Sequence, residues 1–218
     1  MMGQLRFAVI LAGCGNKDGA EIHESVLALL AIDRSGGQYQ CFAPDISQHH
    51  VTNFLTNEPM KETRNVLLES ARIARSEINP LSAFAEPDFD ILVLPGGNGV
   101  AYNLCTFAVD GEKMTVNPDV QRAVQSMHKA NKPIGALCIA PVILAKLFKG
   151  VSLTFGNDAK VNAVAQKWGA FPQDISAIDI VIDPKNKVVT TPCYMLKARV
   201  SQLAEGIEKL VQALIQMT

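Results

Sequence analysis

The sequence predicts an α/β fold in three layers, with a mostly parallel, flavodoxin-like sheet between two layers of helices. Two observations favour it. Short apolar runs alternate with longer stretches of helical periodicity, which is the pattern of βαβ units. Several runs, such as 5–12 (LRFAVILA), are apolar almost throughout, as expected of strands covered on both faces. With 218 residues, no internal repeat and no linker, we expect one domain, 1–218.

The elements follow in order along the chain. The expected strands are the runs at 5–12, 38–43, 90–94, 133–138, 152–155, 179–183 and 188–191. Helical spacing of apolar residues recurs at 21–34, 64–77, 118–130, 141–148, 159–168 and 196–214. In the first of these helices Ile22, Val26, Leu29 and Leu30 have the spacing of one helix face. The last two strands enclose 183–187 and predict a hairpin.

Composition and charge exclude several function classes. Hydrophobic residues make up 48% of the chain and charged residues 19%, and the net charge is −1. We therefore expect a globular protein that binds no nucleic acid and, because no apolar run is long enough to span a bilayer, no membrane. The apolar part of MMGQLRFAVILAG is too short for a secretion signal. The five cysteines are odd in number and form no CxxC pair, which indicates a reducing compartment, so we expect a cytoplasmic protein.

The candidate site lies at the carboxyl ends of the strands, where open α/β sheets bind ligands. The glycine-rich stretch GCGNKDG (13–19) follows the first run, PGGNG (95–99) follows the run at 90–94, and Cys138 follows the run at 133–137. Two glycine-rich loops and a thiol therefore share one edge of the predicted sheet. The spacing of GCGNKDG fits neither a dinucleotide-binding loop nor a P-loop, which argues against a nucleotide there.

Cys138 is the candidate nucleophile. Small residues stand two positions away on each side, at Ala136 and Ala140, as a strained nucleophile elbow requires. Pro141 suits the first turn of a following helix, whose amino terminus would lower the pKa of the thiol. The alternative is a buried, unreactive cysteine, which is a common role for a free thiol. Gly96 and Gly97 allow close backbone approach and oxyanion binding, although a Gly-Gly pair also occurs in ordinary turns.

Three segments carry a family resemblance: LPGG (94–97), ALCIAP (136–141) and DGAEIHESV (18–26). Together they resemble the PfpI branch of the class I glutamine-amidotransferase-like superfamily. The resemblance is greatest to ElbB-like proteins, described as glyoxalases and formerly as sigma cross-reacting or isoprenoid-biosynthesis proteins. It implies that Cys138 is the elbow cysteine and that Glu24 is the acidic residue hydrogen-bonded to it. It also implies that Gly97 and the backbone N–H of Ile139 are the oxyanion donors.

The sequence departs from the glutaminase members of that superfamily, in which a histidine follows the next strand. Here the segment after 152–155 reads GNDAKV and contains none. Without a histidine, acyl transfer from glutamine lacks its general base, so we reject a glutamine amidotransferase. His23 is the one histidine expected near the site. Together with Cys14, in the loop after the first strand, it is a candidate for an accessory role.

The resulting hypothesis is a glutathione-independent glyoxalase. In it Cys138 adds to glyoxal or methylglyoxal and Glu24 shuttles the proton that converts the hemithioacetal to a hydroxy acid. No cofactor is required, and no cluster has metal-ligand spacing. One alternative is a thiol redox sensor or binding protein, with Cys14 as resolving thiol, and another is a deglycase using the same cysteine. By resemblance we expect a homodimer, for which apolar residues at 51–60 (Val51, Phe54, Leu55, Met60) could supply an exposed patch.

Overall fold

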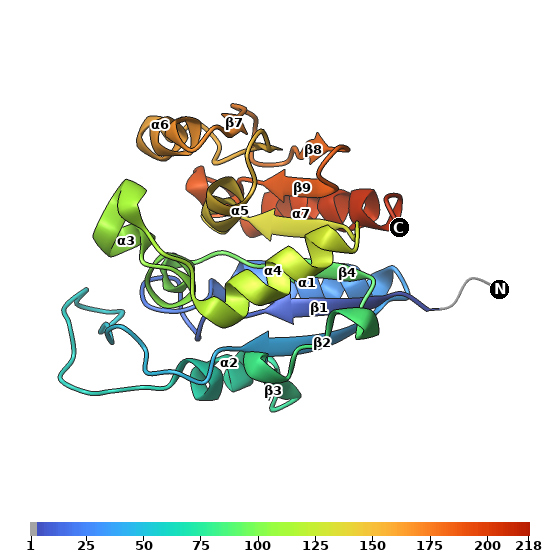
Figure 1. Ribbon diagram of the computed structural model, residues 1–218. Helices are drawn as coiled ribbons and strands as arrows, with labels where there is room; N and C mark the ends of the chain where they lie inside the picture. The colour runs from blue at the N-terminus through green and yellow to red at the C-terminus, as the bar shows by residue number, and fades with distance from the viewer. Residues whose placement is uncertain (1–3) are drawn as a thin grey trace.

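The predicted three-layer architecture is confirmed in the computed structural model, which describes residues 4–218 (Figure 1). Within these residues the central sheet has the strand order β3-β2-β1-β4-β5-β9-β8. Its neighbouring strands pair in parallel except for β8, which pairs antiparallel with β9 and forms the predicted hairpin.

The bounds of the regular elements agree with most of the predicted ones. The strands of the sheet are β1 (Arg6–Ile10), β2 (Gln38–Ala43), β3 (Ile78–Pro80), β4 (Ile91–Leu94), β5 (Ile134–Leu137), β8 (Val181–Asp183) and β9 (Val188–Thr191). The helices are α1 (Ile22–Arg34), α2 (Val66–Ile73), α3 (Phe107–Asp110), α4 (Pro118–Lys129), α5 (Pro141–Leu147), α6 (Ala159–Lys167) and α7 (Val200–Ile215).

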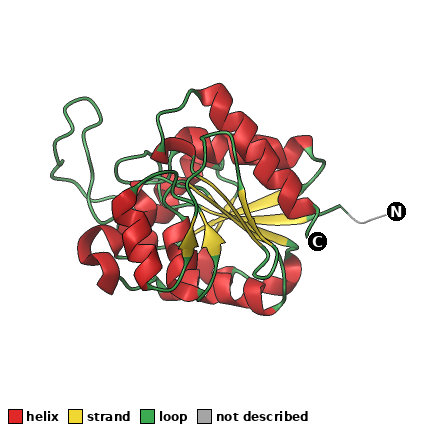
Figure 2. Cartoon of the chain, turned by 90° about the horizontal axis from the view of Figure 1, so that it is seen from above, coloured by secondary structure: helices red, strands yellow, loops and turns green. Residues whose placement is uncertain are grey.

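Helices cover both faces of the sheet (Figures 1 and 2). α1 packs against α7 on one face, and α4 packs against β4, β5 and α5 on the other. Every residue of β4 and β5 is consequently buried, which explains why these runs contain no polar residue. The carboxyl ends of β1, β4 and β5 lie side by side, and the loops that follow them form the candidate site.

The rotation of α1 about its axis differs from the expectation. Of the predicted apolar face, Leu29 is buried as expected, but Ile22, Val26 and Leu30 are 44%, 48% and 39% exposed. The buried face instead carries Glu24 and Ser25, followed by Ala28, Leu29 and Ile32. Glu24 therefore points inward, where its carboxyl group meets the backbone of Gly96 and Tyr194.

The expected strand at 152–155 is not part of the main sheet. Only Ser152–Leu153 (β6) is extended, and it pairs in parallel with β7 (Phe171–Pro172). Two backbone N–H groups of this segment donate to side chains and are not available for strand pairing. Ser152 N–H donates to the Asp183 carboxylate at 2.8 Å, and Thr154 N–H donates to Thr190 Oγ1 at 3.0 Å. The segment therefore lies beside β8 and β9 without joining them.

A long loop between β2 and α2 projects from the body of the molecule (Figures 1 and 2). Its outer part is closed by a bridge between Thr52 and Pro59, and we call residues 52–60 the arm. Leu55 is 94% exposed, and Phe54 and Met60 are also exposed, as expected of the apolar patch. Val51 is buried, so the prediction was wrong for that residue. Among residues 4–218, no helix has the length and apolarity needed to cross a membrane.

Candidate active site

Cys138 lies on a strained turn between β5 and α5. Its φ of +58° is in the left-handed region that L-residues rarely adopt. The backbone holds it there from both sides, because Cys138 N–H donates to Thr191 O at 2.9 Å and Ala140 N–H donates to Leu137 O at 2.9 Å. The small residues at 136 and 140 accordingly flank a sharp strand-to-helix turn, as predicted.

Glu24 is fully buried beside this turn. Its two carboxyl oxygens accept different backbone N–H groups: Gly96 at 3.1 Å on Oε2 and Tyr194 at 3.2 Å on Oε1. The carboxyl group also hydrogen-bonds to the Cys138 side chain. Burial and the negative charge of Glu21 raise the pKa of Glu24 to about 8. At neutral pH the carboxyl is therefore protonated and can donate to the sulfur.

The glycines of the PGGNG loop make this contact possible. A Cβ on Gly96 would lie 2.3 Å from Cys138 Cβ and 2.5 Å from Glu24 Oε2, so no larger residue fits between the two side chains. Gly97 has a φ of +99°, and a Cβ there would lie 2.4 Å from Glu21 N. The backbone N–H groups of Gly97 and Ile139 donate to the Cys138 sulfur and stabilise its thiolate. The residues predicted for an oxyanion site thus surround the sulfur.

The low thiol pKa expected from the sequence is wrong. Burial raises the pKa of Cys138 well above its ordinary value, and a charged Glu24 raises it further. The two backbone N–H groups oppose this rise without cancelling it. α5 contributes little, because it has only seven residues and begins at Pro141, three positions beyond the thiol. The sulfur is therefore a neutral thiol at rest, facing a neutral carboxyl group.

A second thiol, Cys193, belongs to the same cluster and was not singled out from the sequence. It is fully buried, has a φ of +44°, and begins the turn Cys193–Met195 after β9. Burial raises the pKa of Cys193 well above its ordinary value, and negative charge on the nearby Glu24 or Cys138 would raise it further. The following residue, Tyr194, donates its N–H to Glu24. The only signal in the sequence was the position of TPCY directly after a strand that ends at the same edge.

His23 lies at the rim of the site and does not contact the thiol. It is exposed, and its Nδ1 is 2.9 Å from the hydroxyl oxygen of Tyr194. In the segment after β6, where a histidine was absent from the sequence, Gly156 adopts a φ of +65° and Leu196 packs against it. A Cβ at Gly156 would lie 2.7 Å from Leu196 Cγ, so an apolar side chain occupies that space.

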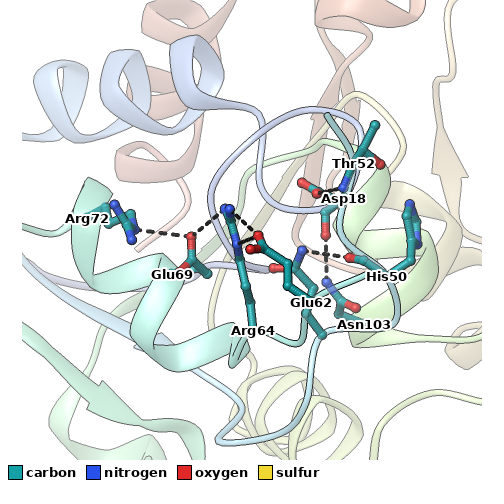
Figure 3. A network of polar contacts seen from close by, with 9 residues as sticks. Asp18, His50, Thr52, Glu62, Arg64, Glu69, Arg72 and Asn103 are labelled. Atoms are coloured by element: carbon teal, nitrogen blue, oxygen red, sulfur yellow. Dashed lines mark hydrogen bonds and ion pairs between the residues drawn. The ribbon is translucent and has the colours of Figure 1, made fainter. Parts of the chain in front are cut away.

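A different polar network surrounds Asp18 (Figure 3), and its charged groups Asp18, Glu69 and Arg72 act on Cys14. Asp18 accepts from Thr52 N–H at 2.7 Å, and Asn103 donates to the backbone oxygen of Asp18 at 3.0 Å. Burial and the carboxylate of Glu69 raise the pKa of Cys14, and the nearby Arg72 lowers it. Charged side chains of this network thus lie near Cys14, whereas Cys193 lies near Cys138. The role of Cys14 as a resolving thiol stays a prediction.

The arrangement of elbow thiol, buried glutamate and paired glycines has counterparts among known proteins. Residues 55–191 match the DJ-1/PfpI family. The chain belongs to the DJ-1/PfpI family. A crystal structure of an isoprenoid biosynthesis protein with an amidotransferase-like domain from Ehrlichia chaffeensis superposes with a TM-score of 0.92. It is 36% identical and covers 98% of this chain and 99% of its own. DJ-1beta of Drosophila melanogaster, 19% identical with a TM-score of 0.56, shares the DJ-1/PfpI fold.

Among relatives of this DJ-1/PfpI chain, the ES1 protein homolog of Rattus norvegicus is 41% identical over 98% of this chain and 84% of its own length. The human glutamine amidotransferase-like class 1 domain-containing protein 3 is 40% identical over 98% and 83%. Both are named as mitochondrial proteins, as is the ES1 protein of Danio rerio. This contradicts the cytoplasmic location expected from the sequence. Free cysteines indicate a reducing compartment and do not distinguish one such compartment from another.

Proposed function

We propose that this protein is a glutathione-independent glyoxalase that converts glyoxal, and by the same steps methylglyoxal, to the hydroxy acid. One observation carries the proposal: the carboxyl group of Glu24 is fully buried beside the elbow thiol of Cys138, with only the Cβ-less Gly96 between them, and burial raises its pKa to about 8. The narrower resemblance to ElbB-like glyoxalases, within the DJ-1/PfpI family, supports it. Cys138 is the proposed nucleophile, and Glu24 is the proposed proton shuttle.

The first step is addition of the thiol to the aldehyde. Loss of one proton from the pair leaves a single proton between the carboxyl of Glu24 and the sulfur of Cys138. In the reactive form the thiolate attacks the carbonyl carbon, and Glu24 gives its proton to the carbonyl oxygen. The products are a hemithioacetal and a Glu24 carboxylate. The N–H groups of Gly97 and Ile139, which surround the sulfur, stabilise the oxygen as its charge develops.

The second step is isomerisation. The Glu24 carboxylate removes the proton from the carbon that bears sulfur, which gives an enediol once the neighbouring carbonyl oxygen takes up a proton. Glu24 then returns its proton to the neighbouring carbon while the hydroxyl group on the sulfur-bearing carbon loses its proton, so that a thioester beside a hydroxymethyl group is formed with no net gain or loss of protons. Water then attacks the thioester, Glu24 accepts its proton, and the thiolate leaves. The sum is glyoxal plus water giving glycolate and one proton. No metal, glutathione or other cofactor takes part.

Access to the site favours small substrates. Cys138 is 7% exposed, Ile139 8% and Glu24 0%. A two- or three-carbon aldehyde reaches such a sulfur more easily than a protein-bound adduct does. This is the reason we place glyoxalase chemistry ahead of deglycase chemistry at the same cysteine.

The test is conversion of glyoxal to glycolate by purified protein without glutathione, followed by enzymatic or chromatographic assay of glycolate. Cys138→Ser should abolish conversion, and Cys14→Ser, which removes the thiol of the other network, should leave it unchanged. Glu24→Gln should turn over at least about 100-fold more slowly because it cannot carry the proton. Activity that survives in Cys138→Ser would overturn the proposal.

A thiol redox sensor remains a second candidate because a buried thiol, Cys193, lies close to Cys138. Oxidation of Cys138 by hydrogen peroxide to the sulfenic acid releases one water, and condensation with Cys193 would release a second and form a disulfide. Intact mass after peroxide treatment distinguishes the outcomes. A loss of two hydrogens that requires both cysteines supports the sensor, and stepwise gain of oxygen on Cys138 contradicts this pairing.

A further inference from the structure

Glu21 is held beside the reacting groups by three contacts. Its carboxylate accepts from Glu24 N–H at 2.7 Å and caps the first turn of α1. The backbone N–H of Glu21 donates to Gly96 O at 2.9 Å. The same backbone nitrogen packs closely against Gly97, since a Cβ on Gly97 would lie only 2.4 Å from it. The residue is only partly buried. Its side chain therefore lies between the buried Glu24 and solvent.

Capping the helix does not by itself require a charge at this position. Ser, Thr, Asn and Asp are the preferred N-cap residues, and of these only Asp carries a charge. A neutral Gln would offer the same carbonyl acceptor to Glu24 N–H. The hydrogen bond of the cap therefore does not require the charge of Glu21.

The electrostatic surroundings of the site are acidic. Glu21 raises the pKa values of Glu24, Cys193 and Tyr194. Among the described residues, the ionisable groups with the largest effects on these three are Glu21, Glu24 and the two thiols, and none is a lysine or an arginine. An anion that approaches Cys138 past Glu21, which is hydrogen-bonded to Glu24 and Gly96, therefore meets the negative charge of this carboxylate.

We propose that Glu21 is a specificity-determining residue whose carboxylate makes the approach to Cys138 favour uncharged aldehydes over anionic ones such as phosphorylated or carboxylated oxoaldehydes. The inference rests on the proposed addition of Cys138 to aldehydes. It adds the substrate class: neutral 1,2-dicarbonyls. Fixed charges in a cleft with low-dielectric walls change local ligand concentration and encounter rates, which is the physical basis of this selection.

Two alkylating reagents of nearly equal size test the charge selection without relying on turnover. Iodoacetamide is neutral and iodoacetate is anionic, and the labelling rate of Cys138 by each is read by peptide mass spectrometry. The ratio of the two rates is divided by the same ratio in urea-unfolded protein to remove intrinsic reactivity. A change in the thiolate fraction affects both reagents equally, so the ratio reports charge at the approach to the sulfur.

The parent protein should prefer iodoacetamide, and Glu21→Gln should reduce the normalised preference by on the order of tenfold. Asp33→Asn is the matched control. It removes one carboxylate from the same helix at a distance of roughly 18 Å, beyond the screening length at physiological salt, and should leave the ratio unchanged. A parallel readout is inhibition of glyoxal turnover by glyoxylate, which should strengthen in Glu21→Gln while the KM for glyoxal changes little.

An unchanged ratio in Glu21→Gln, or an equal change in Asp33→Asn, overturns the inference and leaves the proposed function standing. If the ratio of labelling rates changes as expected but the protein does not turn over glyoxal, charge selection by Glu21 holds and the glyoxalase proposal fails. If neither reagent labels Cys138 in the folded protein, the thiol is closed to small electrophiles and both proposals fail.

Discussion

The buried carboxyl of Glu24 should make the stability of the protein fall as the pH rises, and Glu24→Gln should remove that dependence. The pKa of this group rises from an ordinary 4.5 to about 8 on folding. Below pH 4.5 the side chain is protonated in the folded and the unfolded chain alike. Between 4.5 and about 8 only the unfolded chain releases the proton, so the free energy of unfolding decreases with pH. Above about 8 the folded protein ionises as well and the decrease ends.

The size of the effect follows from the same two values. At roughly 1.4 kcal/mol for each pH unit, the interval from 4.5 to about 8 corresponds to a loss of about 5 kcal/mol. Because Glu24 is fully buried, solvent does not screen this contribution. Glu24→Gln carries a separate cost of roughly 1–3 kcal/mol, since both Glu24 oxygens accept N–H groups and an amide offers one acceptor. That cost is the same at every pH.

The assay is urea denaturation of the parent and Glu24→Gln at intervals from pH 5 to pH 9. The difference in free energy of unfolding between the two proteins should change by about 4 kcal/mol from pH 5 to pH 9, in favour of Glu24→Gln at the alkaline end. Glu58→Gln, on the exposed arm, should run parallel to the parent. Parallel curves for Glu24→Gln and the parent would mean that Glu24 is ionised in the folded protein at neutral pH, and the proton-shuttle mechanism would lose its basis.

Three further outcomes follow from the geometry. Gly96→Ala should destabilise the protein by about 1–3 kcal/mol in urea denaturation and abolish the reactivity of the Cys138 thiol, because the added methyl group overlaps Cys138 Cβ and Glu24 Oε2. An unchanged denaturation midpoint would refute the close contact at Gly96. Iodoacetamide labelling of Cys138 should accelerate as the pH rises through about 8, the pKa of Glu24, whereas a fast reaction at pH 6 would indicate a preformed thiolate. Light scattering should give twice the chain mass of 23.5 kDa, and Leu55→Asp on the arm should shift the equilibrium toward monomer; a concentration-independent monomer excludes the homodimer.

The sequence was sufficient for the features of the site that depend on local backbone geometry. Ala136 and Ala140 predicted the sharp turn at Cys138, since an elbow crowds the residues two positions away, and φ is indeed +58°. Gly96 and Gly97 predicted a close backbone approach. These inferences need only a few consecutive residues and the rule that parallel strands end at one edge.

Features that depend on contacts between distant segments could not be read in this way. Cys193 reaches the site because β9 lies next to β5 with Leu137 opposite Thr191, and no local pattern specifies that register. The rotation of α1 was mispredicted for a related reason: the spacing of Ile22, Val26 and Leu30 marks a helix face, but packing decides which face is buried. The pKa of Cys138 depends on its burial, which no short stretch of sequence encodes.

Within residues 4–218, no cationic side chain is among the groups with the largest effects on the pKa of Cys138, which supports the proposed addition to an aldehyde over cleavage of an amide. Most reactive cysteines are activated by a histidine, a lysine or a helix amino terminus that stabilises the thiolate. Here the sulfur faces a protonated Glu24 and two backbone N–H groups, and Leu196 packs against the segment that carries no histidine. Cleavage of an amide needs a base for the nucleophile and an acid for the leaving amine. Addition to an aldehyde expels no leaving group and needs one proton on the carbonyl oxygen, which a pair sharing one proton can supply.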